Sequence, residues 1–182
     1  MAGIDRKDCG RWQEGDCGTV KPIQLFRIDD RLIHGQVVIG WATFLKTKQI
    51  VLCDDSVSEN EWEKELYLSI VPDHMEAVVV NVAKLAEMLS DAETDLSKTI
   101  ILVNGPQVME QLLEHGASVE RVNVGGIHYK EGRRKYLDYL YLNEEEVASF
   151  RRCMEKGVHF FCQDVPEARI IPLPKVFQKH QK

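Results

Sequence analysis

Short apolar runs alternate with helix-like segments along this chain, and that alternation restricts the fold more than any other feature. Runs such as Val78-Val79-Val80 are rich in β-branched residues, which favour buried strands. A helix between two strands provides the long crossover that parallel pairing needs. The sequence therefore predicts an α/β fold, an open, doubly wound, mostly parallel sheet with helices on both faces. We expect strands at 23–26, 49–53, 76–82, 99–103, 121–124 and 158–162, extended runs at 136–142 and 170–173, and helices at 37–45, 84–89, 107–114 and 144–156, with one more helix capped by Ser56 and ending before Pro72.

One folded domain is expected between residues 22 and 175. A length of 182 residues suits a single domain with a sizeable core. Residues 1–21 are polar and lack periodicity, so they predict a flexible N-terminal extension. Residues 176–182 predict a polar tail.

Charge and apolar patterning exclude several classes of protein. The net charge of −6 gives no basic footprint for nucleic acid. No apolar run approaches the roughly 18 residues of a membrane-spanning helix, and the N-terminus lacks the apolar core of a signal peptide. Five scattered cysteines fit a reducing compartment better than a disulfide scaffold, with Cys53 and Cys162 as core residues. We expect a cytoplasmic protein that is peripheral to a membrane at most.

The segment Arg27-Ile28-Asp29-Asp30-Arg31-Leu32-Ile33-His34-Gly35-Gln36 concentrates charge between a predicted strand and a predicted helix. Such a turn lies at the carboxyl edge of a parallel sheet, where ligands bind. A helix N-terminus attracts phosphate through its unpaired N–H groups and partial positive charge. A neutral imidazole nitrogen is a competent nucleophile at pH 7. The combination predicts phosphoryl transfer through a phosphohistidine at His34.

Two neighbours of His34 have distinct predicted roles. Arg31 would bind the oxygens of the phosphoryl group with its planar guanidinium. Asp29 would orient the imidazole or hold Arg31, because a carboxylate that faced the phosphoryl group would repel it. The residues expected to support phosphate binding are Arg27, Asp30, Gly35, Gln36, Asn104, Gly125 and Gly126. Each residue also has a structural interpretation: His34 as a histidine in a surface turn, Arg31 as a solvated charge, and the aspartates as loop-closing or capping residues. Arg27 could instead pair with an aspartate and close the strand end.

No group of His, Asp and Glu residues has convincing metal-ligand spacing, so we expect no metal and no cofactor. Phosphohistidine exchange needs no bound metal where arginines and backbone dipoles supply the positive potential. His128 follows Gly125-Gly126 and is expected near the same sheet edge. Lys130, Arg133, Arg134 and Lys135 form a basic cluster, interpreted either as a solvated loop or as a docking surface for an acidic partner or lipid.

The segment 27–41 resembles the IIB subunit of the mannose/fructose/sorbose class of the bacterial sugar phosphotransferase system. Two further stretches, Leu102-Val103-Asn104-Gly105-Pro106 and Val122-Asn123-Val124-Gly125-Gly126, agree in order and spacing, and the resemblance covers residues 23 to about 173. It implies a doubly wound sheet and a protein-Nπ-phosphohistidine–sugar phosphotransferase. His34 would accept a phosphoryl group from a IIA protein and pass it to a sugar bound by IIC and IID membrane subunits.

Two other functions are compatible with the same residues. A regulatory or metabolite-binding α/β protein could keep this fold without sugar phosphorylation. A small metal-free phosphatase could use His34, although no general acid is evident in the sequence.

Overall fold

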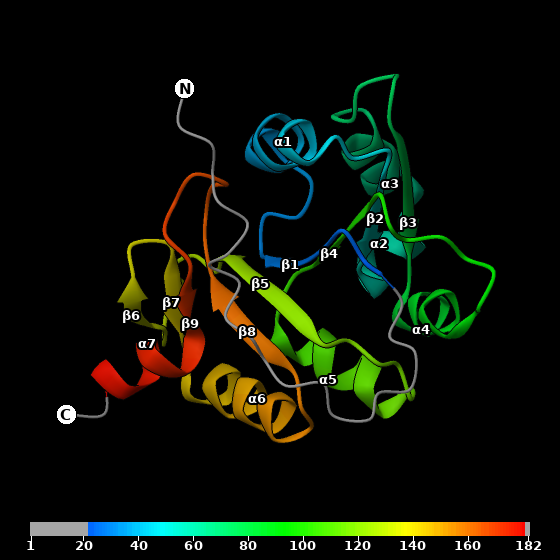
Figure 1. Cartoon of the computed structure of the whole chain (residues 1–182). Helices are drawn as coiled ribbons and strands as arrows, with labels where there is room; N and C mark the ends of the chain where they lie inside the picture. The colour runs from blue at the N-terminus through cyan, green and yellow to red at the C-terminus, as the bar shows by residue number, and fades with distance from the viewer. Residues whose placement is uncertain (1–21, 181–182) are drawn as a thin grey trace, which may run out of the picture.

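The computed structural model describes residues 22–180 and contains a seven-stranded sheet with the order β3-β2-β4-β1-β5-β8-β9 (Figure 1). All neighbouring strands are parallel except β8 and β9. The sheet strands are β1 (Leu25–Asp29), β2 (Gln49–Cys53), β3 (Glu76–Val80), β4 (Thr99–Val103), β5 (Arg121–Gly126), β8 (His159–Cys162) and β9 (Ile171–Pro172). The antiparallel pair β6 (Arg134–Leu137) and β7 (Leu140–Leu142) forms a separate hairpin.

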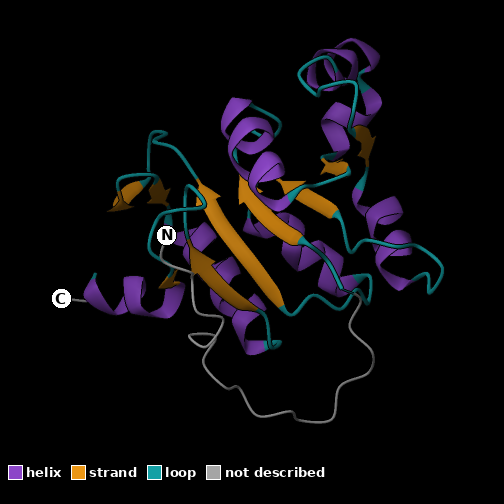
Figure 2. Cartoon of the chain, turned by 45° about the horizontal axis from the view of Figure 1, so that its top comes forward, coloured by secondary structure: helices purple, strands orange, loops and turns teal. Residues whose placement is uncertain are grey.

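Helices cover both faces of the sheet, as Figure 2 shows. One face carries η1 (Gln36–Ala42), α1 (Thr43–Leu45), α2 (Asp55–Glu59) and α3 (Glu61–Leu68), and the other carries α4 (Val82–Ser90), α5 (Pro106–Glu114), α6 (Glu144–Glu155) and α7 (Leu173–Lys179). Two hydrophobic clusters follow from this division. Val37, Trp41 and Ile50 belong to the cluster on the first face, and Leu85 and Phe150 belong to the cluster on the second. The predicted doubly wound α/β fold is confirmed.

The region after β2 differs from the prediction. Ser56 does not cap a long helix there. Asp54 accepts a hydrogen bond from the N–H of Val57 and caps the short helix α2. The chain then becomes extended at Asn60, whose side chain caps α3 by accepting from the N–H of Glu63. The sequence contains two good N-caps in succession, and each starts its own helix.

The C-terminal segment was predicted wrongly as a polar tail. Residues 173–179 form α7, which buries Leu173, Val176 and Phe177 against the core. These positions have the i, i+3, i+4 spacing of an amphipathic helix, and a proline in the first turn is compatible with a helix start. The extended run at 136–142 is likewise divided, into the strands of the β6–β7 hairpin. The predicted flexible extension at residues 1–21 lies outside the described residues.

Within residues 22–180, no helix combines the length and apolar character that crossing a bilayer requires.

Candidate functional site

Asp29 is the last residue of β1 and is buried at the carboxyl edge of the sheet. All five residues of β1 are buried between β4 and β5, and the register with β5 shifts between Ile28 and Asp29. The chain then turns back: the N–H of Leu32 donates to the carbonyl of Asp29 at 3.0 Å, and Leu32 adopts a left-handed backbone with φ 57°. This conformation is uncommon for leucine. The buried side chain of Leu32 helps to hold it, and the turn brings His34 back towards Asp29.

The helix after the turn begins on His34. The N–H groups of Val37 and Val38 both donate to the carbonyl of His34 at 3.0 Å. Helix η1 has π geometry, which is rare and is found frequently at functional sites. His34 therefore lies at a helix N-terminus, as predicted, and its side chain is 19% exposed.

Asp29 is the hub of the site. Its Oδ2 accepts from Arg27 Nη2 at 2.8 Å and lies 3.2 Å from His34 Nε2. Its Oδ1 accepts from the backbone N–H of Arg31 at 3.2 Å and from the Nε of Arg31 at 3.3 Å. The structure thus brings together three of the predicted residues, His34, Arg31 and Asp29, with Arg27 beneath them.

The carboxyl of Asp29 is ionised despite its complete burial. Burial by itself raises the pKa of Asp29. The hydrogen bond from His34 and the charge of Arg27 outweigh that effect and hold the pKa well below its usual range. In the other direction, burial lowers the pKa of Arg27 while the charge of Asp29 opposes the change. An arginine keeps its proton in proteins, so the buried pair is ionic.

The ionised carboxylate determines which nitrogen of His34 is available. A carboxylate only accepts hydrogen bonds, so Nε2 of neutral His34 must carry the proton. Nδ1 then has a free lone pair. The contact with Asp29 thus orients the imidazole and leaves Nδ1 as the ring nitrogen with the free lone pair.

Arg31 presents a partly free guanidinium beside His34. Its side chain is 42% exposed. Its Nε binds Asp29, and its Nη2 donates to Oε1 of Gln36 at 2.8 Å. Within the described residues, the remaining nitrogen Nη1 has no recorded protein partner. Gly35 has nothing within 4 Å of the position a Cβ would occupy, so the approach to His34 at this point is open.

Arg27 pairs with an aspartate at the end of β1, as one of its two sequence interpretations expected, and does not reach the surface. Its side chain is fully buried. Nη1 donates to Asn123 Oδ1 at 2.6 Å and to the carbonyl of Gln163 at 3.2 Å, and Nη2 donates to the carbonyl of Asp164 at 3.1 Å. The guanidinium also lies 5.3 Å from the ring centre of Trp41. Arg27 therefore holds Asp29 in place through an ion pair. It also links β1 to Asn123 of β5, to the segment that follows β8 and to Trp41 of η1.

The two glycines at the end of β5 make room for this arrangement. A Cβ on Gly125 would lie 1.8 Å from Cζ of Arg27, so only glycine admits the guanidinium. A Cβ on Gly126 would approach His128 Cε1 at 3.1 Å and both carboxylate oxygens of Asp29 at 3.5 Å. Gly125 and Gly126 therefore leave room for the buried ion pair beside His34, and their predicted support of phosphate binding stays a prediction.

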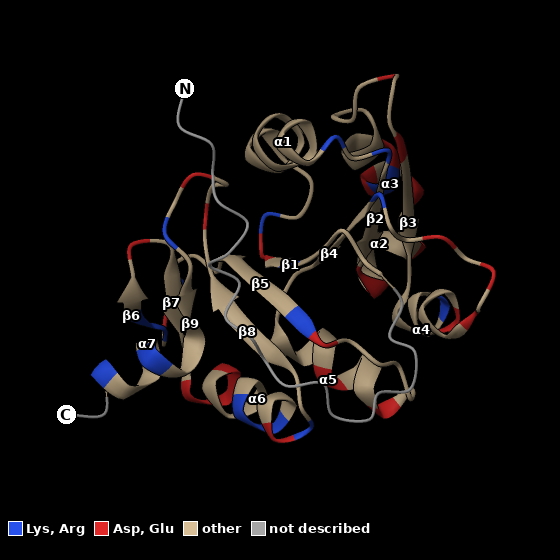
Figure 3. Ribbon diagram, in the orientation of Figure 1, with Lys and Arg blue, Asp and Glu red and all other residues tan. Residues whose placement is uncertain are grey.

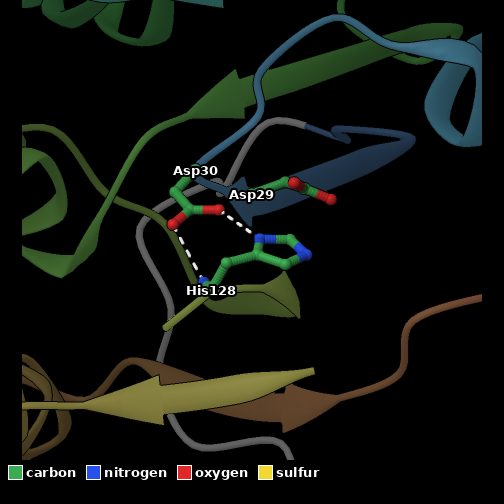
Figure 4. Close-up of side chains that lie close together, drawn as sticks. All are labelled: Asp29, Asp30 and His128. Carbon is green, nitrogen blue, oxygen red and sulfur yellow. Dashed lines mark hydrogen bonds and ion pairs between the residues drawn. The ribbon is translucent and has the colours of Figure 1, made fainter. Parts of the chain in front are cut away.

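Asp30 binds residues of the loop that follows β5. Its Oδ1 lies 2.6 Å from Nδ1 of His128, and its Oδ2 accepts from the backbone N–H of His128 at 2.9 Å (Figure 4). Arg133 Nη1 donates to the same Oδ2 at 3.2 Å. Arg133 Nη2 donates to Oε1 of Glu146, which lies in the first turn of α6. Asp30 therefore fixes the loop after β5. The nearby His128 was placed correctly at this edge by the sequence, but no pattern predicted its link to Asp30.

One cluster of side chains is close enough together to hold a metal ion, but its carboxylates are already paired with arginines. The cluster consists of Asp29, Asp30 and His128. One potential ligand atom from each lies within 4.8 Å of the others. Both carboxylates already bind guanidinium groups, Asp29 those of Arg27 and Arg31 and Asp30 that of Arg133. These cations supply the positive charge that a metal would bring, so the residues of this cluster do not suit one.

Asn104 lies apart from the His34–Asp29 pair. Its Nδ2 donates to Asp54 Oδ2 at 2.6 Å and joins the loops after β2 and β4. Both residues line a polar pocket of about 350 Å³ that also touches Asp30 and Leu32. Asn104 was therefore predicted on the correct edge of the sheet, but it binds Asp54 and has no recorded contact with His34.

The basic cluster after β5 is not a free positive surface. Arg133 is only 9% exposed and pairs with Asp30 and Glu146. Arg134 pairs with Glu144 at 3.2 Å, and Lys135 pairs with Asp138 at 2.7 Å. Arg133 is therefore not available to bind a docking partner. At Arg134 and Lys135, the paired carboxylates offset the positive charge that a docking surface would need. Lys130 is exposed and has no recorded partner among the described residues.

Known proteins share this sequence and this arrangement of strands. The family model described as the sorbose-subfamily IIB component of the sugar phosphotransferase system (PTS) matches residues 23–182. The fructose-specific EIIB component of Bacillus subtilis is 30% identical over 144 residues, which span 79% of this chain and 88% of that protein. The mannose-specific EIIAB component of Escherichia coli is 30% identical over 136 residues, 75% of this chain and 42% of that protein.

Solved structures agree with the sequence comparisons. The IIBSor domain of the sorbose permease from Klebsiella pneumoniae has a TM-score of 0.78 and 25% identity, and the match covers 86% of this chain and 96% of that one. The manxB structure from Thermoanaerobacter tengcongensis has a TM-score of 0.80 and 26% identity, with 91% and 100% covered.

Proposed function

Because this chain belongs to the sorbose subfamily of IIB components of the sugar phosphotransferase system, we propose that His34 is its phosphoryl carrier. A phosphorylated IIA protein donates the group, and a sugar held by IIC and IID membrane subunits receives it. The activity is that of a protein-Nπ-phosphohistidine–sugar phosphotransferase acting at the cytoplasmic side of the membrane. The observation that carries the proposal is the 3.2 Å contact between Asp29 Oδ2 and His34 Nε2.

Two in-line displacements at one nitrogen make up the reaction. In the first, the bond from phosphorus to the donor histidine breaks while the bond to Nδ1 of His34 forms. In the second, the phosphorus–Nδ1 bond breaks while a bond to a sugar hydroxyl oxygen forms, and the hydroxyl proton is released. Such transfers depend chiefly on positioning and charge neutralisation.

Each neighbour of His34 contributes to one of these requirements. Asp29 keeps the proton on Nε2 and fixes the ring. Arg31 offers its free Nη1 to a phosphoryl oxygen, supported by Asp29 and Gln36. The first N–H groups of η1 add positive potential at the same point. Arg27 remains beneath Asp29 and sustains its negative charge.

The decisive experiment is phosphoryl uptake from phosphorylated IIA. We expect one acid-labile phosphoryl group on the wild-type protein, attached to Nδ1 of His34 as resolved by nitrogen-15 NMR of the imidazole. His34→Ala should take up none and change the free energy of unfolding by about 1 kcal/mol or less, because no core cavity forms. His74→Ala, at an exposed histidine, is the matched control. Phosphoryl uptake by His34→Ala at another histidine would overturn the assignment.

The comparisons give no support to the regulatory or metabolite-binding alternative.

A further inference from the structure

Helix α3 exposes an apolar stripe on an otherwise acidic surface. Trp62 is 71% exposed, Leu66 50% and Ile70 41%. Trp62 and Leu66 are one turn apart on the same side of α3, and Ile70 lies in the turn that follows the helix. They account for three of the seven large exposed hydrophobic side chains among the described residues. A concentration of this kind marks an interaction surface more often than scattered apolar residues do.

The core does not explain the stripe. Helix α3 buries none of its residues, and Tyr67 is the side chain through which it packs against the cluster beneath it. Trp62, Leu66 and Ile70 are exposed and belong to neither hydrophobic cluster of the described residues. A soluble helix needs no tryptophan in this position for its own stability.

The charge around the stripe restricts what can cover it. Helix α3 contains Glu61, Glu63 and Glu65 close in sequence to Trp62 and Leu66, and its one cation, Lys64, is paired with Glu61 at 2.7 Å. Figure 3 shows the acidic positions of α3 in red. Anionic lipid head groups would be repelled by this surface. A second copy of the chain would place glutamates opposite glutamates. The complementary partner is a basic segment that also carries apolar side chains.

The proposed function supplies a partner of this chemistry. Cytoplasmic loops of membrane proteins carry an excess of lysine and arginine. Helix α3, which carries Trp62 and Leu66, also lies close to the site. Its residues Glu63 and Tyr67 line the same 350 Å³ pocket as Asp30 and Leu32 from the loop that carries His34. A partner seated on α3 would therefore stand beside the phosphoryl donor.

We propose that Trp62, Leu66 and Ile70 form a docking stripe for a basic cytoplasmic segment of the membrane subunits that receive the phosphoryl group. This inference rests on the proposed function only for the identity of the partner. The apolar residues provide the contact area, and the glutamates provide orientation and a faster encounter.

Binding to membranes tests the stripe without any phosphoryl transfer. Full-length protein is sedimented with vesicles that contain the IIC and IID subunits, and with vesicles of the same lipid without them. We expect binding only to the first, with the apparent Kd raised at least tenfold by Trp62→Ser with Leu66→Ser. Ile170→Ser, at an isolated exposed apolar residue, should leave the Kd unchanged.

A second pair of variants tests the charge. Glu61→Lys with Glu65→Lys should weaken binding, most strongly at low salt. Glu114→Lys with Glu155→Lys, an equal change of net charge at exposed positions on α5 and α6, should not. All variants should retain the wild-type melting temperature, since every substituted side chain is exposed.

Three outcomes would overturn the docking stripe. An unchanged Kd in the Trp62 and Leu66 variant would place the contact elsewhere. Equal binding of wild-type protein to plain lipid would make the surface a lipid anchor. Slower phosphorylation of His34 by IIA in the stripe variant, with membrane binding intact, would assign the surface to IIA. Failure of wild-type protein to accept any phosphoryl group would refute the carrier function while leaving the binding result informative.

Discussion

Gly125 and Arg27 are in such close contact that a single added methyl group would lie 1.8 Å from the guanidinium carbon. The guanidinium cannot move aside freely, because it is fully buried and bonded to Asp29, Asn123 and two backbone carbonyls. We predict that Gly125→Ala lowers the free energy of unfolding by about 1–3 kcal/mol, the usual range for overpacking. Urea unfolding measures this. Gly40→Ala, where nothing lies within 4 Å, should not lower stability.

Asp29→Asn should have a stability cost that depends on pH. The pKa of Asp29 is lowered in the folded protein, so its ionised form favours folding. That contribution is complete above about pH 5 and is lost as the pH falls through the folded pKa. At pH 7 the variant leaves Arg27 buried and uncompensated, which costs about 3–5 kcal/mol.

Urea unfolding of both proteins at pH 7, 4 and 3 measures the difference between Asp29→Asn and wild type. It should shrink with falling pH. Asp138→Asn, at an exposed aspartate, is the control. A difference of the same size at all three pH values would show that Asp29 contributes through packing alone.

Arg31→Lys should retain the charge and lose function. Lysine cannot donate to Asp29, Gln36 and a phosphoryl oxygen from one rigid plane. By comparison with the removal of an oxyanion donor, we expect phosphoryl transfer to slow by about 10²-fold or more. Rapid-quench kinetics with phosphorylated IIA give the rate. Arg134→Lys, at an exposed arginine, should transfer at the wild-type rate, and a wild-type rate for Arg31→Lys would leave Arg31 without a role in the reaction.

Arg133 and Arg134 are neighbours in sequence with opposite expected responses to charge reversal. Arg133→Glu would place a third carboxylate beside those of Asp30 and Glu146. The side chains at all three positions are 9% exposed or less, so the repulsion is weakly screened. We expect a loss of about 3–5 kcal/mol. Arg134→Glu breaks only an exposed pair and should change stability by about 0.5 kcal/mol or less. Thermal unfolding of the two single variants compares them, and equal losses would contradict the buried network.

Local patterns predicted the strands and the strand-to-helix turn well. The ranges 49–53 and 99–103 agree with β2 and β4, because continuous apolar runs between polar ends define central parallel strands. The proximity of Asp29, Arg31 and His34 followed from their positions in one turn. A short turn at a strand end restricts where its side chains can lie.

Local sequence patterns did not predict the contacts between segments that are far apart in the chain. Arg27 is 96 residues from Asn123 and 136 from Gln163, and nothing local distinguishes a buried arginine from a phosphate ligand. Arg133 belongs to a basic run that resembles a solvated loop until Asp30 and Glu146 are placed beside it. The π geometry of η1 likewise depends on how its residues pack and has no sequence signal of its own.

In the proposed reaction, the hydrogen bond between His34 and Asp29 would have opposite effects on the two phosphoryl transfers. A carboxylate that accepts from one imidazole nitrogen increases the electron density at the other. A more basic Nδ1 attacks an incoming phosphoryl group more readily, yet it is a poorer leaving group when the group departs. If His34 is the carrier, as proposed, the orientation that makes it a good acceptor would also slow spontaneous loss of the phosphoryl group to water, and the proposed sugar-bearing partner would have to supply electrophilic assistance for the second transfer.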